Sequence, residues 1–386
     1  MLDNSEKIYY IANARMPTEK AHGIQIAKMC EALIEAGADL TLVVTNRITE
    51  QHSLRDYYGL RVDIPTVRLP VLDFYTRGRV GYRIASYSFA LSYLVFILWR
   101  RLRGEHFILY TVDLDNFSSS LLALTNTVLF TEMHGGKPDT VEQCLLFRAL
   151  QGVIPINRII ADELQKKFPL SRAKYLVEPN GIDESIFYPR NKAEARKRLG
   201  IPQEEKMLLY SGRMFGWKGL EIVPQAAVLC PEVIWRIVGG TKKEYENVVD
   251  ISPPANLLFM GSQPYEDMSW WLAAADVVLV LGTKRDQQSY YYTSPMKLFE
   301  YLTAERPIIA ADTPALREIV SEKEVVFYTP DDAHDLEEKV QYALSSAAEV
   351  NICVVNASKK SLIYTWKGRG ERVLAFIKQT INDINL

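Results

Sequence analysis

Short apolar runs alternate with stretches of helical periodicity along most of this chain. Such runs, four to six residues long, are typical of strands buried on both faces of a sheet. In the first half we expect strands at Lys7–Ala12, Leu40–Val44, Phe107–Thr111, Thr127–Phe130 and Arg158–Ile160. Apolar residues at helical spacing predict a helix from about Ile24 to Ala36, which Gly37 ends.

A second series of the same kind follows. Its strands are expected at Met207–Ser211, Trp235–Val238, Asn256–Phe259, Asp276–Leu281 and Pro307–Ala310, with a helix at Leu220–Leu229. The alternation of strands with helices predicts an α/β protein with parallel sheets.

The alternation breaks at Pro179-Asn180-Gly181-Ile182-Asp183, where turn residues precede a charged segment. A chain of 386 residues is also long for a single core. We therefore expect an N-terminal Rossmann-like domain over residues 1–185 and a C-terminal domain over residues 186–363. An amphipathic helix over residues 364–386 is expected to cross back towards the N-terminal domain. Two such domains imply a central cleft between them, which is the usual place for a ligand.

Net charge, cysteine spacing and the first residues give no signal for several classes of protein. The formal net charge of −2 gives no overall signal for nucleic acid. Four cysteines, at positions 30, 144, 230 and 353, match no metal or redox spacing. The polar start, Met1 to Lys7, has no features of a signal peptide. We expect a cytoplasmic protein that does not bind nucleic acid.

One helical stretch, Ile84 to Trp99, carries no charged residue and falls short of the ~20 residues that a membrane span needs. The plainer interpretation is a well-buried helix. Around it, however, arginines outnumber acidic residues and aromatic residues are interleaved with them, which is typical of a surface that attracts anionic lipid headgroups. This second interpretation predicts peripheral docking on the inner face of the membrane through Arg77, Arg79, Arg83, Arg100, Arg101 and Arg103.

The run Thr293-Ser294-Pro295-Met296-Lys297-Leu298-Phe299-Glu300 combines a Ser-Pro turn, the start of a helix and an acid on its first turns. Amides at a helix start suit a phosphate or sugar hydroxyls, and a carboxylate suits a ribose diol. Earlier in the chain, Arg213 and Lys218 lie in a glycine-bearing loop after an expected strand. Two cations there can neutralise a diphosphate. Together these motifs indicate a nucleotide site.

The order and spacing of these motifs resemble glycosyltransferases of the GT4 type, which have the GT-B fold. The resemblance spans nearly the whole chain. It rests on Ser211-Gly212-Arg213 with Lys218-Gly219, Pro179-Asn180-Gly181-Ile182-Asp183, Ser294-Pro295-Met296-Lys297 with Glu300, Thr131-Glu132-Met133-His134, and Tyr364-Thr365-Trp366. It implies two Rossmann-like domains facing a central cleft, and transfer of a sugar from a nucleotide diphosphate sugar to a hydroxyl acceptor.

The resemblance also implies roles for single residues. Arg213 and Lys218 would bind the donor diphosphate without a metal or further cofactor, and His134 would lie near the reacting sugar. Glu300 would bind the ribose. Other donor contacts are expected from Gly212, Ser294, Met296, Lys297, Leu298, Gly261 and Gly23, the last allowing close backbone approach. Transfer would retain the anomeric configuration, and a lipid-linked or surface glycan is the expected acceptor.

Three alternatives stay open. Most members of the resembling family carry a second glutamate where this chain has Tyr292, so a non-catalytic nucleotide-sugar-binding protein is one of them. A sugar-nucleotide epimerase of the same fold is another, with Glu132 and His134 as its acid and base candidates. Asp113-Leu114-Asp115 also matches the metal-binding Asp-x-Asp of the other large transferase fold. That fold would not require a second α/β half.

Overall fold

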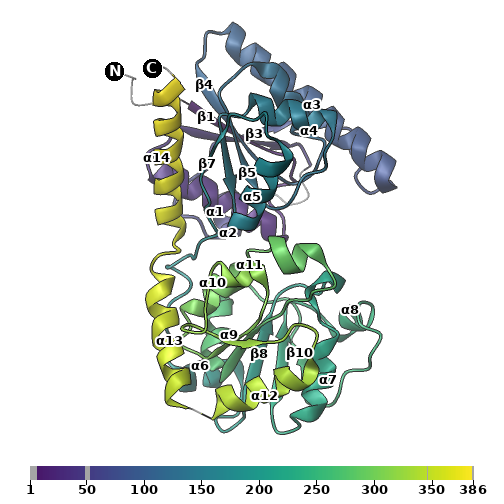
Figure 1. The fold of residues 1–386 in the computed structure, drawn as a ribbon, viewed down its shortest axis with the longest axis vertical. Coiled ribbons are helices and arrows are strands. Elements are labelled where there is room, and N and C mark those ends of the chain that lie inside the picture. Colours follow the sequence, from purple (N-terminus) through teal and green to yellow (C-terminus); the bar gives the residue numbers. More distant parts are fainter. Residues whose placement is uncertain (1–6, 48–52, 346, 385–386) are drawn as a thin grey trace. The chain divides into compact units, whose positions relative to one another are not determined.

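The protein is described from a computed structural model that covers residues 7–47, 53–345 and 347–384. Contacts divide the chain into two compact units, Met1–Pro179 with Trp366–Leu386, and Asn180–Thr365 (Figure 1). The division thus falls at Pro179, a few residues before the position expected from the charged segment, and the last helix belongs to unit 1. The N-terminal residues 1–6, on which the expectation about a signal peptide rests, lie outside the described part of the chain.

Unit 1 is built on a sheet of seven parallel strands in the order β3-β2-β1-β4-β5-β6-β7. The strands are β1 (Lys7–Ala12), β2 (Leu40–Thr45), β3 (Thr66–Leu69), β4 (Phe107–Val112), β5 (Leu129–Met133), β6 (Gly152–Pro155) and β7 (Lys174–Tyr175). Its helices are α1 (Ala21–Glu35), α2 (Leu54–Tyr58), α3 (Gly78–Leu102), η1 (Ser120–Thr125), α4 (Val141–Ala149), α5 (Arg158–Lys167) and α14 (Trp366–Ile384).

Unit 2 has six parallel strands in the order β10-β9-β8-β11-β12-β13. They are β8 (Met207–Ser211), β9 (Ile234–Val238), β10 (Leu257–Phe259), β11 (Val277–Val280), β12 (Ile308–Ala311) and β13 (Val326–Tyr328). The helices are α6 (Lys192–Leu199), η2 (Gly216–Lys218), α7 (Ile222–Leu229), α8 (Lys242–Glu246), η3 (Tyr265–Asp267), α9 (Met268–Ala274), η4 (Gln288–Tyr292), α10 (Met296–Leu302), α11 (Pro314–Arg317), α12 (Ala333–Leu344) and α13 (Ala348–Ser361).

Burial explains why the strands could be read from apolar runs. Every residue of β2, β4 and β8 is buried, because helices cover both faces of a parallel sheet. The expected parallel α/β architecture is therefore confirmed in both units.

One expected strand is wrong. Arg158–Ile160 begins helix α5, and the neighbouring strand is β6, Gly152–Pro155. The reason is a helix cap: the side chain of Asn157 accepts a hydrogen bond from the amide of Ile160.

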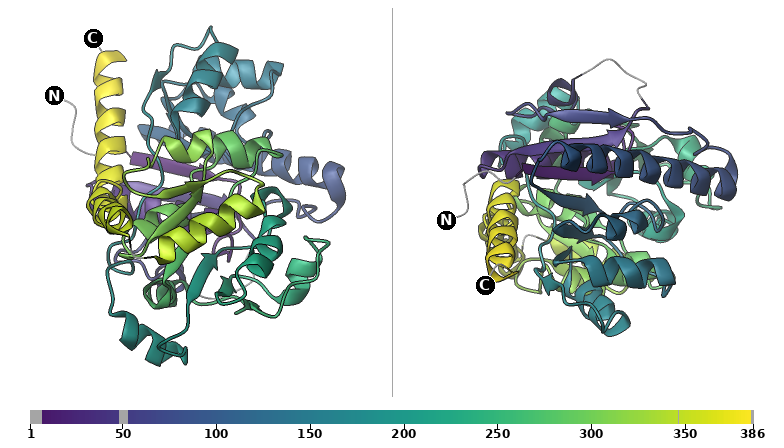
Figure 2. Two further views of the ribbon diagram at one scale, coloured as in Figure 1. Left: turned by 60° about the horizontal axis from the view of Figure 1, so that its bottom comes forward. Right: turned by 90° about the horizontal axis from the view of Figure 1, so that it is seen from above.

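The plainer interpretation of Ile84 to Trp99 as a well-buried helix is also wrong. Helix α3 has 25 residues and runs along the outside of unit 1 (Figure 2). Its face with Ala85, Phe89, Tyr93 and Ile97 is fully buried, while large apolar side chains on the opposite face are exposed. Among the described residues it is the one helix long and apolar enough to cross a membrane. Its buried face, however, packs in unit 1.

Helix α14 packs closely against α1 within unit 1. A Cβ added to Gly370 would lie 2.6 to 2.7 Å from the backbone and Cβ of Ala32. Glycine at this position therefore sets the distance between the two helices.

We predict that Gly370→Ala destabilises the protein. Alanine normally stabilises a helix interior by up to ~1 kcal/mol relative to glycine, but here the methyl group would push α14 away from α1, and overpacking costs roughly 1–3 kcal/mol. The measurement is chemical denaturation. Gly216→Ala is the control, because a Cβ there would meet only Val248 Cγ1, at 3.8 Å. Equal or greater stability of Gly370→Ala would contradict the packing account.

Candidate functional site

The topology of unit 2 has a switch point, a position where the strand order reverses, at the carboxyl edge of its sheet. From β8 the chain passes to β9 and β10 on one side, and then returns to β11 on the other side of β8. In open parallel sheets, ligands bind where the strand order reverses in this way. Here the position is marked by Gly212 after β8 and Gly282 after β11.

Gly212 lies at the centre of a group of cations. A Cβ at this residue would lie 2.6 Å from Lys297 Nζ and 3.7 Å from Lys218 Nζ, and its φ of +135° also disfavours any other residue. Lys218 Nζ donates to the carbonyl of Arg213 at 2.9 Å, and Lys297 Nζ lies 3.8 Å from the centre of the Tyr210 ring. The two ammonium groups thus meet over the end of β8.

Burial and the proximity of these cations lower the pKa values of both lysines. Burial and the neighbouring Arg213 lower the pKa of Lys218 to about 8. Burial and then Lys218 lower the pKa of Lys297 well below its ordinary value. An anion bound between them would favour the charged form of both, so this place is suited to a phosphate or diphosphate.

Glu300 is a second unusual group in unit 2. It lies on α10, is 7% exposed, and accepts a hydrogen bond from the Tyr265 hydroxyl at 3.1 Å. Burial raises the pKa of Glu300 to about 7, although Tyr265 and Lys297 act in the opposite direction. A buried carboxylate with one hydroxyl partner can accept further hydrogen bonds from a ligand diol.

Side-chain hydrogen bonds hold α10 against the end of β8. The Tyr301 hydroxyl accepts from the amide of Ser211 at 2.8 Å and lies 2.9 Å from its Oγ. Asn180 Nδ2 donates to the Ser294 carbonyl at 2.8 Å, so the Asn-Gly turn fixes the start of the Ser-Pro segment. The sequence indicated this turn as a domain boundary and as part of the family resemblance, but not its bond to Ser294, because a contact across more than a hundred residues leaves no local signal.

Ser294 and Gly261 lie in loops that follow strands β11 and β10, at the carboxyl edge of the same sheet. Ser294 Oγ is buried and has no hydrogen-bond partner in the described part of the chain. Gly261 follows β10, and its carbonyl accepts from the Gly239 amide at 2.8 Å, which joins two loops of the same edge.

Two further residues of α10, Met296 and Leu298, were predicted to contact the donor, and they differ in burial. Met296 begins the helix and is half-buried, whereas Leu298 is fully buried and its amide donates to the Pro295 carbonyl. Leu298 therefore contributes packing. Tyr292, at the position of the family's other glutamate, is the last residue of η4.

In unit 1 the strand order reverses between β1 and β4, and His134 follows β5 at the same carboxyl edge. His134 Nε2 lies 2.9 Å from Glu132 Oε1. Glu132 is fully buried and has further donors in Gln25 Nε2, at 2.7 Å, and the Tyr110 hydroxyl, at 3.0 Å. The histidine ring is thus held by a buried carboxylate.

Gly23 has a different role from the one its sequence suggested. It lies within α1, which begins at Ala21, and a Cβ there would lie 2.4 Å from the Tyr58 hydroxyl and 2.5 Å from Thr18 Cγ2. The close approach that requires glycine is therefore an internal packing contact. The expectation of close approach to a donor has no support here.

Both carboxylates of the Asp-x-Asp motif, Asp113 and Asp115, bond to other residues of unit 1. Asp113 forms an ion pair with the buried Lys137. Asp115 accepts from Asn13 Nδ2 and from the amides of Phe117 and Ser118, each at 2.6 Å. Among the described residues, no group of three or more His, Cys, Asp or Glu side chains is placed to hold a metal ion.

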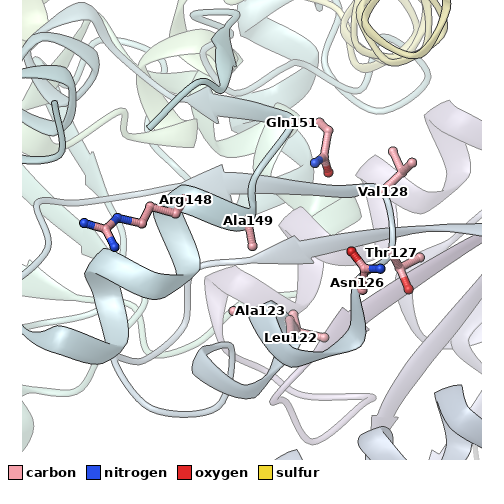
Figure 3. Close-up of a pocket in the computed structure, with 8 residues that line it drawn as sticks. All are labelled: Leu122, Ala123, Asn126, Thr127, Val128, Arg148, Ala149 and Gln151. Atoms are coloured by element: carbon pink, nitrogen blue, oxygen red, sulfur yellow. The ribbon is translucent and has the colours of Figure 1, made fainter. Parts of the chain in front are cut away.

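A pocket of about 330 Å³ lies elsewhere in unit 1, lined by residues such as Asn126, Arg148 and Gln151 (Figure 3). These residues precede β5 or β6, so the pocket opens at the amino edge of the sheet. It is separate from the carboxyl-edge residues described above.

Comparison with known proteins agrees with this geometry. Residues 191–360 match the family described as glycosyl transferases group 1. The chain is 24% identical over 218 residues to D-inositol 3-phosphate glycosyltransferase 1 of Catenulispora acidiphila, a match covering 52% of this chain and 50% of that protein. D-inositol 3-phosphate glycosyltransferase of Mycobacterium bovis is 23% identical over 218 residues, covering 53% of this chain and 44% of that protein. The match therefore spans about half the length of these curated relatives.

Solved structures match over almost the full length. Sucrose-phosphate synthase of Thermosynechococcus elongatus has a TM-score of 0.76 at 18% identity, covering 98% of this chain and 100% of that one. Anabaena Alr3699/HepE in complex with UDP and glucose has a TM-score of 0.67 at 17% identity, covering 97% and 100%. WaaG, a glycosyltransferase involved in lipopolysaccharide biosynthesis, has a TM-score of 0.66 at 13% identity, covering 96% and 99%. The chain therefore has the GT-B fold, and residues 191–360, in its second unit, match the glycosyl transferases group 1 family.

Proposed function

We propose that the protein transfers a sugar from a nucleotide diphosphate sugar to a hydroxyl acceptor, with retention of anomeric configuration. The observation that carries this proposal is the convergence of Lys218 and Lys297 on Gly212 at the switch point of unit 2. Two ammonium groups with lowered pKa values form a site that gains most when a diphosphate binds.

The proposed chemistry depends on charge that develops during the reaction. As the bond from the sugar to the diphosphate breaks, negative charge builds on the leaving group. Arg213, Lys218 and Lys297 would stabilise that charge, and only interactions stronger in the transition state than in the ground state accelerate the reaction. Glu300 would hold the ribose, and His134 would contact the reacting sugar. No cofactor is invoked, because these cations supply the neutralisation.

The donor base is expected to lie near the stretch from Gly261 to Tyr265, which follows β10 and includes the tyrosine bonded to Glu300. Since the neighbouring Anabaena structure holds UDP and glucose, uridine nucleotides are the first probes. A thermal-shift comparison of UDP, GDP and ADP and their sugars would identify the base, since a ligand at a hundred times its Kd stabilises the fold by ~2.7 kcal/mol.

We further propose a cytoplasmic protein that docks on the inner face of the membrane through α3, with a lipid-linked or surface glycan as acceptor. Eight large apolar side chains along this helix are at least 39% exposed, and all except Trp99 recur at a spacing of three or four, which places these seven on one stripe. They are Val80, Ile84, Tyr87, Leu91, Val95, Leu98 and Leu102.

Charge around the stripe favours an anionic surface over a second copy of the chain. Arg79 and Arg83 are exposed near the start of α3, and Arg101 and Arg103 near its end. Pairing of two α3 helices in either direction would bring arginines beside arginines, which repel. Anionic headgroups would instead attract them while the stripe enters the acyl boundary.

The two alternative functions differ from transfer in their products. A free nucleotide diphosphate that appears only with an acceptor supports transfer. A new sugar nucleotide without an acceptor indicates an epimerase, and neither product indicates a non-catalytic binding protein. Glu132 already bonds four side chains, which disfavours its use as an epimerase acid or base.

We predict that Lys218→Ala lowers kcat by about 100- to 1000-fold, as expected for loss of a group that stabilises developing charge. Glu300→Ala should raise the KM for the donor by roughly tenfold or more, since a hydrogen bond to a charged group is worth about 1.5–3 kcal/mol. Steady-state kinetics measures both. Lys206→Ala is the control, because Lys206 is exposed just before β8, at the other end of the same strand. Full activity of Lys218→Ala would contradict the assignment.

A second prediction concerns pH and Glu300. Its pKa is raised from 4.5 to about 7 in the folded protein, so the folded state binds the proton more tightly than the unfolded chain. The stability of the wild type relative to Glu300→Gln should therefore fall by ~3 kcal/mol as pH rises from about 4.5 to about 7, and stay constant above that. Denaturation curves across this range measure the difference. A difference that stays constant or rises with pH would show that folding does not raise the pKa of Glu300.

A third prediction concerns the membrane. Leu91→Glu should reduce co-flotation with vesicles of phosphatidylglycerol and phosphatidylcholine about tenfold or more, because it removes apolar burial and adds a like charge. Leu170→Glu is the control, since Leu170 is 66% exposed in the loop after α5. Wild-type binding should also weaken with salt. A wild type that does not float, or that dimerises through α3 in the absence of vesicles, would contradict membrane docking.

A further inference from the structure

Helix α14 places an arginine in the core of unit 1, next to the carboxylate that holds His134. Arg369 Nη2 donates to Glu132 Oε1 at 2.8 Å, and Nη1 to Oε2 at 3.3 Å. The two side chains are 1% and 0% exposed. They come from positions 237 residues apart, so no local sequence signal indicates the pair.

The charge state of Glu132 follows from this environment. Burial alone would raise its pKa, but Arg369 and then His134 bring the pKa of Glu132 down to about 2. An ionised carboxylate only accepts hydrogen bonds. His134 must therefore carry a proton on Nε2, the ring nitrogen that lies 2.9 Å from Glu132. The carboxylate thus fixes both the direction of the ring and the position of its proton.

The same guanidinium also bonds the chain at its passage between the units. Arg369 Nε donates to the Pro179 carbonyl at 2.8 Å, and Pro179 is the last residue of unit 1 before the chain enters unit 2. Trp366, three positions before Arg369, is the first residue after the chain returns. Arg372, three positions after Arg369, donates to the Glu178 carboxylate from Nε at 2.6 Å and from Nη2 at 3.0 Å.

We propose that Arg369 is a positioning residue for the transfer reaction: through Glu132 it fixes the ring orientation and the Nε2–H form of His134. The inference rests on the proposed role of His134. A buried ion pair is weak evidence for stability alone, because apolar residues of similar volume often stabilise as well. A carboxylate that must stay ionised inside a core does, however, need a buried cation beside it.

The competing explanation is that Arg369 only fastens α14 to unit 1. Arg372 offers a matched control for this explanation, because it bonds the same passage three residues further along the same helix but has no bond to Glu132. Loss of either arginine should lower the unfolding temperature. Only loss of Arg369 should change the ring orientation and the tautomer of His134.

The experiment compares Arg369→Met, Arg369→Lys and Arg372→Met in the full-length protein. The ring nitrogens of ¹⁵N-labelled His134, assigned by their loss in His134→Asn, report its tautomer. In Arg369→Met we expect a mixture of tautomers and a kcat lower by about 10- to 100-fold, with nucleotide affinity unchanged because the donor residues lie in unit 2. Arg369→Lys, which keeps the charge, should recover the Nε2–H form. Arg372→Met should keep wild-type kcat and tautomer.

An unchanged tautomer and kcat in folded Arg369→Met would overturn the proposal, as would equal effects of Arg369→Met and Arg372→Met. If Arg369→Met does not fold, Glu132→Gln combined with Arg369→Met removes both charges. A wild-type tautomer in that double variant would also overturn it. Failure of the proposed function appears separately, as a wild type without transfer activity or a His134→Asn variant with full activity, and the nitrogen signals still decide the role of Arg369.

Discussion

Parallel strand pairing is the constraint on which both units depend. Because all strands of a sheet point the same way, the loops that follow them gather at one edge, and residues distant in sequence meet there. In unit 2 this brings the loop after β8 to the start of α10, so that Lys218 and Lys297 share the space over Gly212. In unit 1 it places His134 at the corresponding edge. The grouping of these side chains is therefore a consequence of the sheet direction combined with a few polar residues at strand ends.

Burial then gives these residues unusual properties. Three cases show how the outcome depends on the partner. Glu132 is ionised because Arg369 lies beside it, whereas Glu300, with a neutral hydroxyl as its bonded partner, has a pKa of about 7. Lys297 lies close to another cation and its pKa falls. A buried cation beside another cation, such as Lys297, would be stabilised by an anionic ligand. Glu132, in contrast, already has its counter-ion in Arg369.

Much of this could be predicted from the sequence, where the signal is local. The strands Lys7–Ala12 and Met207–Ser211 were expected with the bounds that the structure shows, since they are short apolar runs ended by polar or glycine residues. The Arg213 to Gly219 loop and the Ser-Pro segment were also recognisable by their order. The features that the sequence did not predict depend on contacts between residues far apart in the chain. Asn180 fixes the Ser294 carbonyl, Arg369 reaches Glu132, and Gly23 packs on Tyr58. The exposed stripe of α3 was missed for a different reason, because apolar periodicity alone does not show which face the fold covers.

The central claim is that the cations around Gly212 bind a diphosphate, and the Lys218 ammonium reports this most directly. Its pKa can be followed by ¹⁵Nζ resonance in selectively labelled protein, without ligand and with inorganic pyrophosphate or UDP. The free protein should show a pKa of about 8 for Lys218. Because an anion favours the charged form, the account predicts that either ligand raises this pKa and that the Lys206 signal does not move. A Lys218 pKa unchanged by saturating diphosphate would contradict the claim.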